Sequence, residues 1–187
     1  MNLIESNNAC EVESTKESGT DNIDIRGQYI PPLLFACVTP GVFRGCYPKD
    51  SSIPFLMRMK LKTIVSVTPD PLPLSFLTKL GSDLNYIHIA GEEEQKKSKK
   101  KKSIPINFEI VNHALAILNN SDMQPVFVHC LNGKQATSLI IACYRISHGW
   151  SLRSALAEYT RFSDYARPDI AFLENYHDCS RTGNFHL

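Results

Sequence analysis

The sequence predicts an α/β domain with a mostly parallel central sheet flanked by helices, and two observations carry this prediction. Short runs of apolar, largely β-branched residues, such as 63–67 and 125–129, have the length and composition of buried strands. They alternate with longer segments whose apolar residues recur at helical spacing. Strands that alternate with helices form a mostly parallel sheet covered on both faces, and ligands then bind beyond the carboxyl ends of the strands.

The first half of the chain is expected to alternate between short strands and short helices. The expected strands are residues 33–38, 41–44, 63–67 and 85–89, and the expected helices are 53–60 and 74–80. Thr39-Pro40-Gly41 is a turn signal between the first two strands, and Thr68-Pro69-Asp70-Pro71 ends the third.

The second half is expected to be helical around one buried strand, residues 125–129. The expected helices are residues 106–118, residues 137–146, a helix capped by Ser151, and residues 169–176. The first of these has one continuous apolar face. Residues 137–146 are apolar almost all round, which predicts a helix buried in the core.

Composition limits the domain organisation and the function classes. Residues 1–27 and 179–187 offer little to bury and are expected as a disordered N-terminal tail and a C-terminal tail, which leaves one domain at 28–178 with a charged insertion at 90–104. A formal net charge of +1 argues against binding to nucleic acid or to a membrane surface, and no apolar run reaches the ~18 residues of a membrane span. Six cysteines without a CxxC pair, in a chain without a signal-like apolar segment, predict reduced thiols in a cytosolic or nuclear protein and no metal site.

The segment after the strand at 125–129 has the pattern of an anion-binding loop. The strand runs through His129 and Cys130 into a loop that contains Gly133, and a helix follows at once. In this arrangement several backbone N–H groups and the positive end of the helix dipole point at one spot. A cysteine at the mouth of such a cradle has its thiolate stabilised, which suits a nucleophile that attacks phosphorus.

The same segment resembles a known signature, His-Cys-x-x-Gly-x-x-Arg-Ser/Thr, and matches it at His129, Cys130, Gly133 and Thr137. Residues 42–48, 61–67 and 150–162 match in the same order and at similar spacing. On these residues the chain resembles the plant and fungal atypical dual-specificity phosphatases of the protein tyrosine phosphatase superfamily, over residues 32–177. Within them it is most similar to the fungal group named for oxidant-induced cell-cycle arrest.

The resemblance implies a cysteine-based phosphatase fold, a cytoplasmic location and specific roles in the loop. Cys130 is then the nucleophile that forms a phosphocysteine, Thr137 assists release of its thiolate, and His129 orients the loop by a hydrogen bond. The remaining phosphate-loop residues are Leu131, Asn132, Gly133, Lys134, Gln135 and Ala136. Active relatives remove phosphate from phosphotyrosine or from inositol pyrophosphates, use no cofactor or metal, and assemble with related phosphatases, so that the expected ligands are phosphotyrosine or an inositol polyphosphate.

Ala136 departs from the signature at a position that affects catalysis, because the family has an arginine there. That arginine grips two phosphate oxygens through its planar fork, and by analogy with an arginine finger its loss costs roughly 10³-fold or more in rate. Lys134 is a point charge without the fork. Arg145, nine residues on, lies about 13 Å along the helix and does not reach back. We therefore expect a catalytically impaired pseudophosphatase, with a slow but active cysteine-dependent phosphatase as the alternative.

The charged insertion leaves several possibilities open. The resemblance places the general acid there, and Glu92, Glu93 or Glu94 would each serve. The run at residues 92–102 is either a solvated, mobile insertion, or a positive patch that attracts a polyanion through Lys99–Lys102, or a nuclear-import patch.

Six polar residues are expected to have structural roles only. Arg44 is expected at a strand end in an exposed ion pair, with no role in the site. Asp164, Arg167 and Asp169, around the start of the last helix, are expected to cap it or to form salt bridges. Asn132 and Gln135 are expected at the rim of the loop.

Overall fold

A computed structural model describes residues 29–90, 105–164 and 166–183. Its centre is a five-stranded sheet in the order β1-β2-β5-β3-β4. The strands are β1 Ala36–Thr39, β2 Val42–Cys46, β3 Thr63–Val67, β4 Asn85–Ile89 and β5 Val126–Cys130. Neighbouring strands are parallel except for β1, which runs antiparallel to β2. The predicted α/β fold with a mostly parallel sheet is therefore confirmed.

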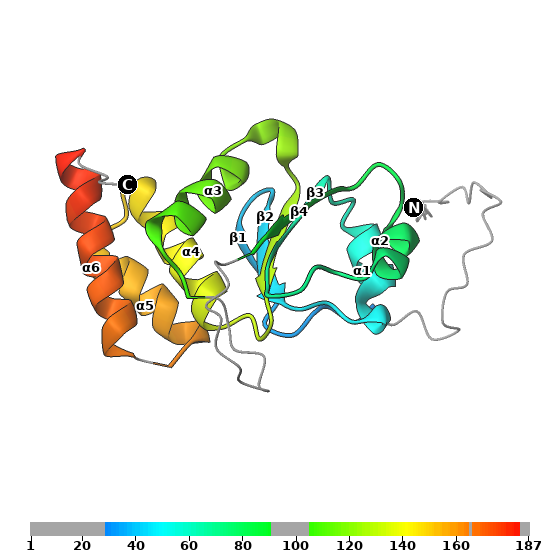
Figure 1. Cartoon of the computed structure of the whole chain (residues 1–187), viewed down its shortest axis with the longest axis horizontal. Helices are drawn as coiled ribbons and strands as arrows, with labels where there is room; N and C mark the ends of the chain where they lie inside the picture. The colour runs from blue at the N-terminus through cyan, green and yellow to red at the C-terminus, as the bar shows by residue number, and fades with distance from the viewer. Residues whose placement is uncertain (1–28, 91–104, 165, 184–187) are drawn as a thin grey trace, which may run out of the picture.

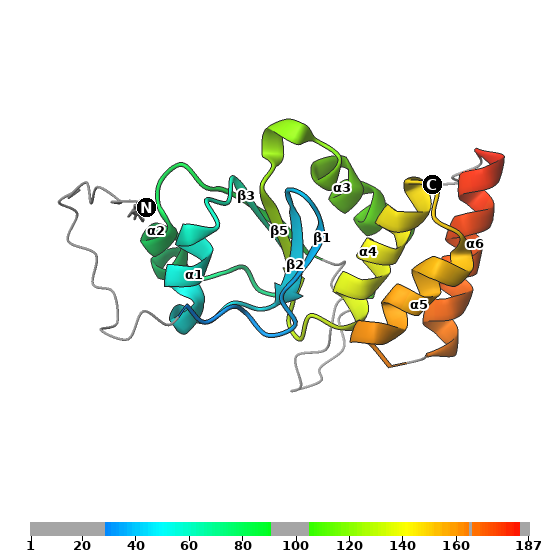
Figure 2. The same cartoon turned by 180° about the vertical axis from the view of Figure 1, so that it is seen from behind.

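Helices cover both faces of the sheet (Figures 1 and 2). The α-helices are α1 Ile53–Arg58, α2 Leu74–Leu80, α3 Phe108–Leu118, α4 Gln135–Ser147, α5 Leu152–Phe162 and α6 Arg167–Thr182. Short 3₁₀ turns lie at Asp50–Ser52 and Ser121–Met123. Helices α1 and α2 lie on one side of the sheet and α3 to α6 on the other (Figure 1). Among the described residues, the helices are too short or too polar to cross a membrane.

The two faces of β5 contribute to two different cores. Val126, Val128 and Cys130 belong to the larger core, which β5 shares with α3 to α6. Phe127 points the other way and belongs to the smaller core with α1 and α2. Every residue of β5 is buried, which is why its sequence is apolar without alternation. The alternation of side chains along the strand puts Cys130 on the face that α4 covers.

Helix α4 is the central helix of the larger layer, as its all-round apolar sequence predicts. Ten of its residues are buried, in a continuous run from Ala136 to Tyr144 and again at Ile146. It contacts α3, α5 and α6 as well as β5. It begins at Gln135, two residues before the predicted start, and so directly follows the loop after β5.

Side-chain caps fix the starts of two other helices. The Asn107 Oδ1 accepts a hydrogen bond from the backbone N–H of Ile110 at 2.8 Å, so α3 begins at Phe108 rather than at the predicted residue 106. Ser151 caps α5 as predicted, because its Oγ accepts from the N–H of Ser154 at 3.2 Å.

The last helix is longer than the predicted residues 169–176. Helix α6 extends to Thr182, four residues into the segment expected as the tail 179–187. It is held by a buried stripe of Ile170, Leu173 and Tyr176, and it ends where Gly183 adopts a left-handed φ of 70°. A glycine after a polar last turn was the stop signal in the sequence. The predicted tail at residues 1–27 lies outside the described residues, as does all but the first residue of the insertion at 90–104.

Candidate phosphate-binding site

The loop after β5 joins the carboxyl end of the strand to the first residue of α4, at the edge of the sheet where a ligand was expected. Gly133 has φ +67°, a conformation that L side chains rarely adopt, and it makes the turn of the loop. The Asn132 Oδ1 accepts the N–H of Lys134 at 2.9 Å and lies 3.6 Å from the Cys130 Sγ, which donates to it. Asn132 is exposed, and its side chain holds the loop in shape through these two hydrogen bonds, a role that the sequence did not predict.

The start of α4 supplies the donors of an anion cradle. The first N–H groups of a helix have no acceptor one turn earlier, and in α4 these belong to Gln135, Ala136 and Thr137. Lys134, the N-cap residue, makes no side-chain capping hydrogen bond within the described structure. The positive end of the helix dipole lies at the same place, so the loop is built to hold a negative charge.

The two residues with predicted chemical roles both lie at this cradle. Cys130, at the end of β5, is 3% exposed. Thr137, in the first turn of α4, is fully buried, and its Oγ1 has no hydrogen-bond partner among the described residues. A buried hydroxyl without a partner is unfavourable, so it is available for the thiolate-assisting role that the resemblance assigns to Thr137.

His129 is a neutral orienting residue. Its ring is completely buried and lies 2.6 Å from the Ser66 Oγ through Nε2, and 3.4 Å from the carbonyl of Cys130 through Nδ1. Burial lowers the pKa of His129 to about 4; the hydrogen bond to the Cys130 carbonyl raises the pKa by a smaller amount, and the electrostatic interaction with His88 lowers it slightly further. At neutral pH the imidazole is therefore uncharged, and its hydrogen bonds join the end of β5 to Ser66 and to the Cys130 carbonyl.

The described structure holds no arginine side chain in the loop itself. Ala136 is 2% exposed and belongs to the larger core. Lys134 is exposed at the rim. Arg145 is engaged elsewhere, because its guanidinium donates to Glu158 at 2.7 and 3.3 Å and to the Val38 carbonyl at 2.7 Å. The prediction that Arg145 does not reach back to the loop is confirmed.

Arg44 corrects the expectation of an exposed ion pair without a role in the site. It is the central residue of β2 and only 1% exposed. Its Nη2 donates to the carbonyl of Gly133 at 2.9 Å and to the Ser138 Oγ at 2.8 Å, and its guanidinium lies 3.8 Å from the centre of the Phe162 ring. The alternation along β2 puts residue 44 on the face of the sheet that α4 and α5 cover, which agrees with its contacts to Ser138 and Phe162.

Asp169 and Gln135 also have roles that the sequence did not predict. Asp169 is 6% exposed, and its carboxylate accepts the Tyr159 hydroxyl at 2.6 Å and the Gln135 Nε2 at 2.8 and 3.1 Å. It therefore connects α5 and α6 to the first turn of α4, where a capping or salt-bridge role was expected. Gln135 is more than a rim residue, since it joins this loop-bearing turn to α6.

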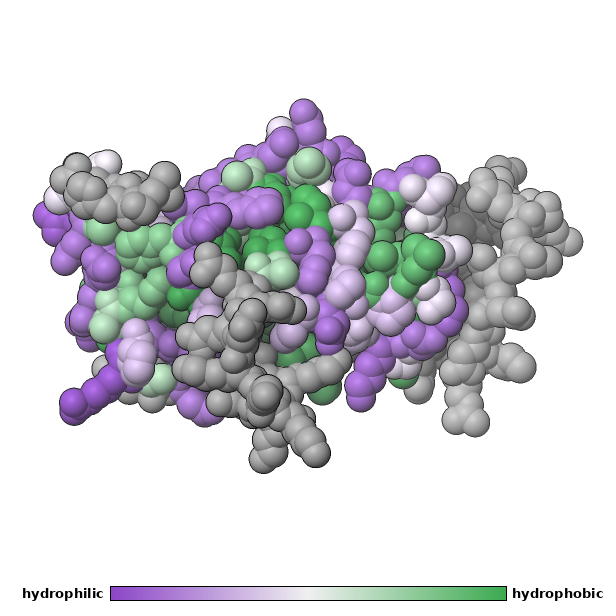
Figure 3. Space-filling view, in the orientation of Figure 1, coloured by the Kyte–Doolittle hydropathy of each residue, from purple (hydrophilic) through white to green (hydrophobic). Residues whose placement is uncertain are grey.

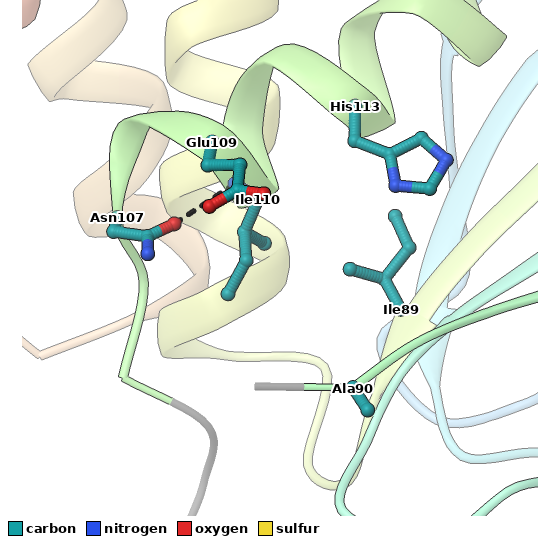
Figure 4. Close-up of a pocket in the computed structure, with 6 residues that line it drawn as sticks. All are labelled: Ile89, Ala90, Asn107, Glu109, Ile110 and His113. Carbon is teal, nitrogen blue, oxygen red and sulfur yellow. Dashed lines mark hydrogen bonds between the residues drawn. The ribbon is translucent and has the colours of Figure 1, made fainter. Parts of the chain in front are cut away.

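A pocket of about 350 Å³ opens at the same edge of the sheet, between the end of β4 and the start of α3. Ile89, Ala90, Asn107, Glu109, Ile110 and His113 line it (Figure 4). Figure 3 shows hydrophobic surface in this region, between α3 and β4. The three glutamates expected to include the general acid, residues 92–94, lie outside the described residues.

Comparisons with known proteins agree with this geometry. A family model described as "Tyrosine phosphatase family" matches residues 29–183. The chain is 34% identical over 158 residues to "Putative tyrosine-protein phosphatase OCA6" of Saccharomyces cerevisiae, covering 79% of this chain and 70% of that protein. It is 33% identical over 144 residues to "Inositol diphosphatase DSP2" of Oryza sativa subsp. japonica, covering 75% and 67%.

A solved structure shows the same fold. The core catalytic domain of the PP-IP phosphatase SIW14 from S. cerevisiae, crystallised in complex with citrate, superposes with a TM-score of 0.70 and 27% sequence identity, and the match covers 83% of this chain and 96% of that one. The predicted cysteine-based phosphatase fold is confirmed. Because the family model spans most of the chain, this protein belongs to the tyrosine phosphatase family.

Proposed function

We propose that this protein is a pseudophosphatase, a family member that binds phosphate ligands or partner phosphatases and turns substrate over poorly. One observation carries the proposal. The loop keeps the thiol of Cys130 and the open start of α4, but a buried methyl group at Ala136 takes the place of the family's arginine. Binding to backbone N–H groups survives this change, whereas stabilisation of the transferring phosphoryl group loses its two-point grip.

The alternative is a slow phosphatase, which the retained chemical groups favour. In that reaction the Cys130 thiolate forms a bond to phosphorus as the bond between phosphorus and the leaving oxygen breaks. The leaving oxygen takes a proton from an acid that the described residues do not identify. Water then hydrolyses the phosphocysteine, with the Thr137 hydroxyl stabilising the departing thiolate. The Thr137 Oγ1, which has no hydrogen-bond partner in the part of the chain that the structure describes, supports this alternative.

For the ligand, we propose phosphotyrosine or a densely phosphorylated inositol. The rice relative is named an inositol diphosphatase, and the yeast neighbour a PP-IP phosphatase. The positive run Lys99–Lys102 would add affinity for a polyanion, but it lies outside the described residues. Neutralising these four lysines should weaken binding of inositol hexakisphosphate in calorimetry, and an unchanged affinity would count against this part of the proposal.

The same proposal includes a cytoplasmic location and assembly with related phosphatase-family proteins. The resemblance to the fungal group supports both. Co-purification of the tagged chain with such relatives from a cytoplasmic fraction is the expected result.

Single-turnover hydrolysis of p-nitrophenyl phosphate and of an inositol pyrophosphate tests the two alternatives. Wild type, Cys130→Ser and Ala136→Arg are compared, with Leu131→Arg as the control that adds the same charge elsewhere in the loop. Activity in Ala136→Arg alone, with binding of inorganic phosphate in wild type, supports the pseudophosphatase. Release by wild type that disappears in Cys130→Ser supports the slow enzyme. If wild type binds no phosphate and Ala136→Arg, folded by its melting temperature, stays inactive, both are wrong.

A further inference from the structure

A buried positive charge lies directly behind the phosphate loop. The Arg44 guanidinium reaches from β2 to the carbonyl of Gly133, inside the loop, and to the hydroxyl of Ser138, at the start of α4. The contacts at 2.9 and 2.8 Å fix one side of the guanidinium, and the ring of Phe162 covers its face at 3.8 Å. The side chain is 1% exposed, so water does not screen its charge.

Among the described residues, Arg44 forms no salt bridge that would neutralise this charge. Burial lowers the pKa of Arg44 to about 10, while electrostatic interactions with Glu158 and then Cys130 raise it, so the guanidinium remains protonated at neutral pH. Glu158 already pairs with Arg145. The Nε and Nη1 of Arg44 have no hydrogen-bond partner in the part of the chain that the structure describes. A buried cation in this state is costly unless a negative charge lies nearby.

The position of Arg44 next to α4 raises the free-energy cost of its buried charge further. The first turn of α4 carries the positive end of the helix dipole, where a second positive charge is unfavourable. The two positive features become favourable together once an anion occupies the loop, because both then face a negative charge. The arrangement is that of a site organised around an anion.

We propose that Arg44 is the fixed cation of the phosphate loop, a positioning residue that stabilises bound phosphate from behind in a loop that has Ala136 in place of arginine. This inference rests on the proposed function, that the loop binds phosphate. Arg44 acts through the backbone that it holds and through its field; it does not replace the two-point grip of the missing arginine. Anion affinity therefore survives where turnover does not.

Two variants separate charge from shape. Arg44→Gln removes the charge and keeps a hydrogen-bonding side chain, whereas Arg44→Lys keeps the charge and loses the fork. The ligand probe is tungstate, a tetrahedral anion, measured by calorimetry. We expect about tenfold or greater loss of affinity in Arg44→Gln and a smaller loss in Arg44→Lys.

A second measurement does not respond if Arg44 has a purely structural role. The rate of Cys130 alkylation is measured with iodoacetate, which is negative, and with iodoacetamide, which is neutral, using peptide mass spectrometry to follow this cysteine alone. The ratio of the two rates reports the electrostatic potential at the loop, because the fraction of thiolate cancels. The ratio should fall about tenfold in Arg44→Gln and stay near the wild-type value in Arg44→Lys.

The outcomes distinguish the inference from the proposed function. Wild-type tungstate binding that Arg44→Gln leaves unchanged overturns the role of Arg44 and leaves the proposed function standing. Equal losses in the Gln and Lys variants with an unchanged ratio also overturn it. Absence of tungstate binding in wild type overturns both. If Arg44→Gln does not fold, Glu158→Gln decides: removing this negative charge should tighten tungstate binding, and unchanged or weaker binding contradicts the inference.

Discussion

Gly133, in the phosphate loop, lies directly on the backbone of Gly45, at the end of β2. A Cβ atom at position 133 would come within 2.8 Å of the Gly45 carbonyl carbon and oxygen, and within 2.7 Å of the Cys46 nitrogen. Real Cβ atoms essentially never approach backbone atoms so closely. The loop is thus seated on β2 by a contact that only glycine permits, and Arg44 donates to the carbonyl of the same glycine.

Gly133→Ala should therefore destabilise the protein by clearly more than a positive φ alone explains. The matched control is Gly149→Ala, at φ +83° with no atom within 4 Å of the added Cβ, which should cost about 1–2 kcal/mol. Gly133→Ala should cost about 1–3 kcal/mol more, because neighbouring backbone must move. Urea unfolding of both variants measures the difference. Equal losses would show that the loop does not press on β2.

Asp169 should be a main stabiliser of the start of α4. Asp169→Asn removes the negative acceptor of the Tyr159 hydroxyl and the Gln135 amide, and we expect a loss of about 2–3 kcal/mol. Tyr159→Phe, which removes one donor, should cost about 1 kcal/mol or somewhat more. A double-mutant cycle in urea unfolding checks the coupling. Additive losses would mean that the 2.6 Å bond between Tyr159 and Asp169 contributes nothing of its own.

The order of strands and helices was predictable from local sequence patterns. The residues that hold the phosphate loop in place were not. Residues that are neighbours in the sequence are enough to recognise the buried strands, the all-round apolar helix α4 and the strand–Gly–helix loop. The role of Arg44 depends on Gly133 and Ser138, 89 and 94 residues away, and that of Asp169 on Gln135, 34 residues away. Such contacts appear only when the sheet is assembled. The end of α6, in contrast, can be recognised from the local sequence, because Gly183 is a helix stop signal.

Because His129 is held neutral in the folded protein, the free energy of unfolding should decrease in mild acid. Its folded pKa of about 4 lies below the value of about 6.5 for an unperturbed histidine, so the unfolded chain binds a proton that the folded chain does not. Stability from this residue is therefore complete above pH 6.5 and is lost as the pH falls from about 6.5 to 4, by on the order of 3 kcal/mol.

The difference between two proteins isolates this effect from the carboxylates that titrate in the same range. His129→Gln keeps a hydrogen-bonding side chain next to Ser66 and does not titrate. It should be less stable than wild type at pH 7 and approach wild type as the pH falls to 4.5, in urea unfolding followed at each pH. Parallel pH profiles for the two proteins would mean that His129 is not held neutral.

Glu158 should contribute far more to stability than an exposed partner in a salt bridge. It accepts two hydrogen bonds from Arg145 in a pair whose side chains are 15% and 12% exposed, and its charge also acts on the buried Arg44. Glu158→Gln leaves two largely buried cations without this carboxylate, so we expect a loss of about 2–3 kcal/mol.

The control for Glu158 is the exposed pair between Lys79 and Asp50, 2.6 Å apart with side chains 53% and 70% exposed. Asp50→Asn should cost less than about 1 kcal/mol, and the cost should shrink further at 0.5 M salt. The loss in Glu158→Gln should change little with salt, because its partners are screened poorly by solvent. Urea unfolding of both variants at low and high salt is the measurement. A salt-sensitive loss of the same size in both would mean that water reaches Glu158, and the charge of Arg44 would then be screened as well.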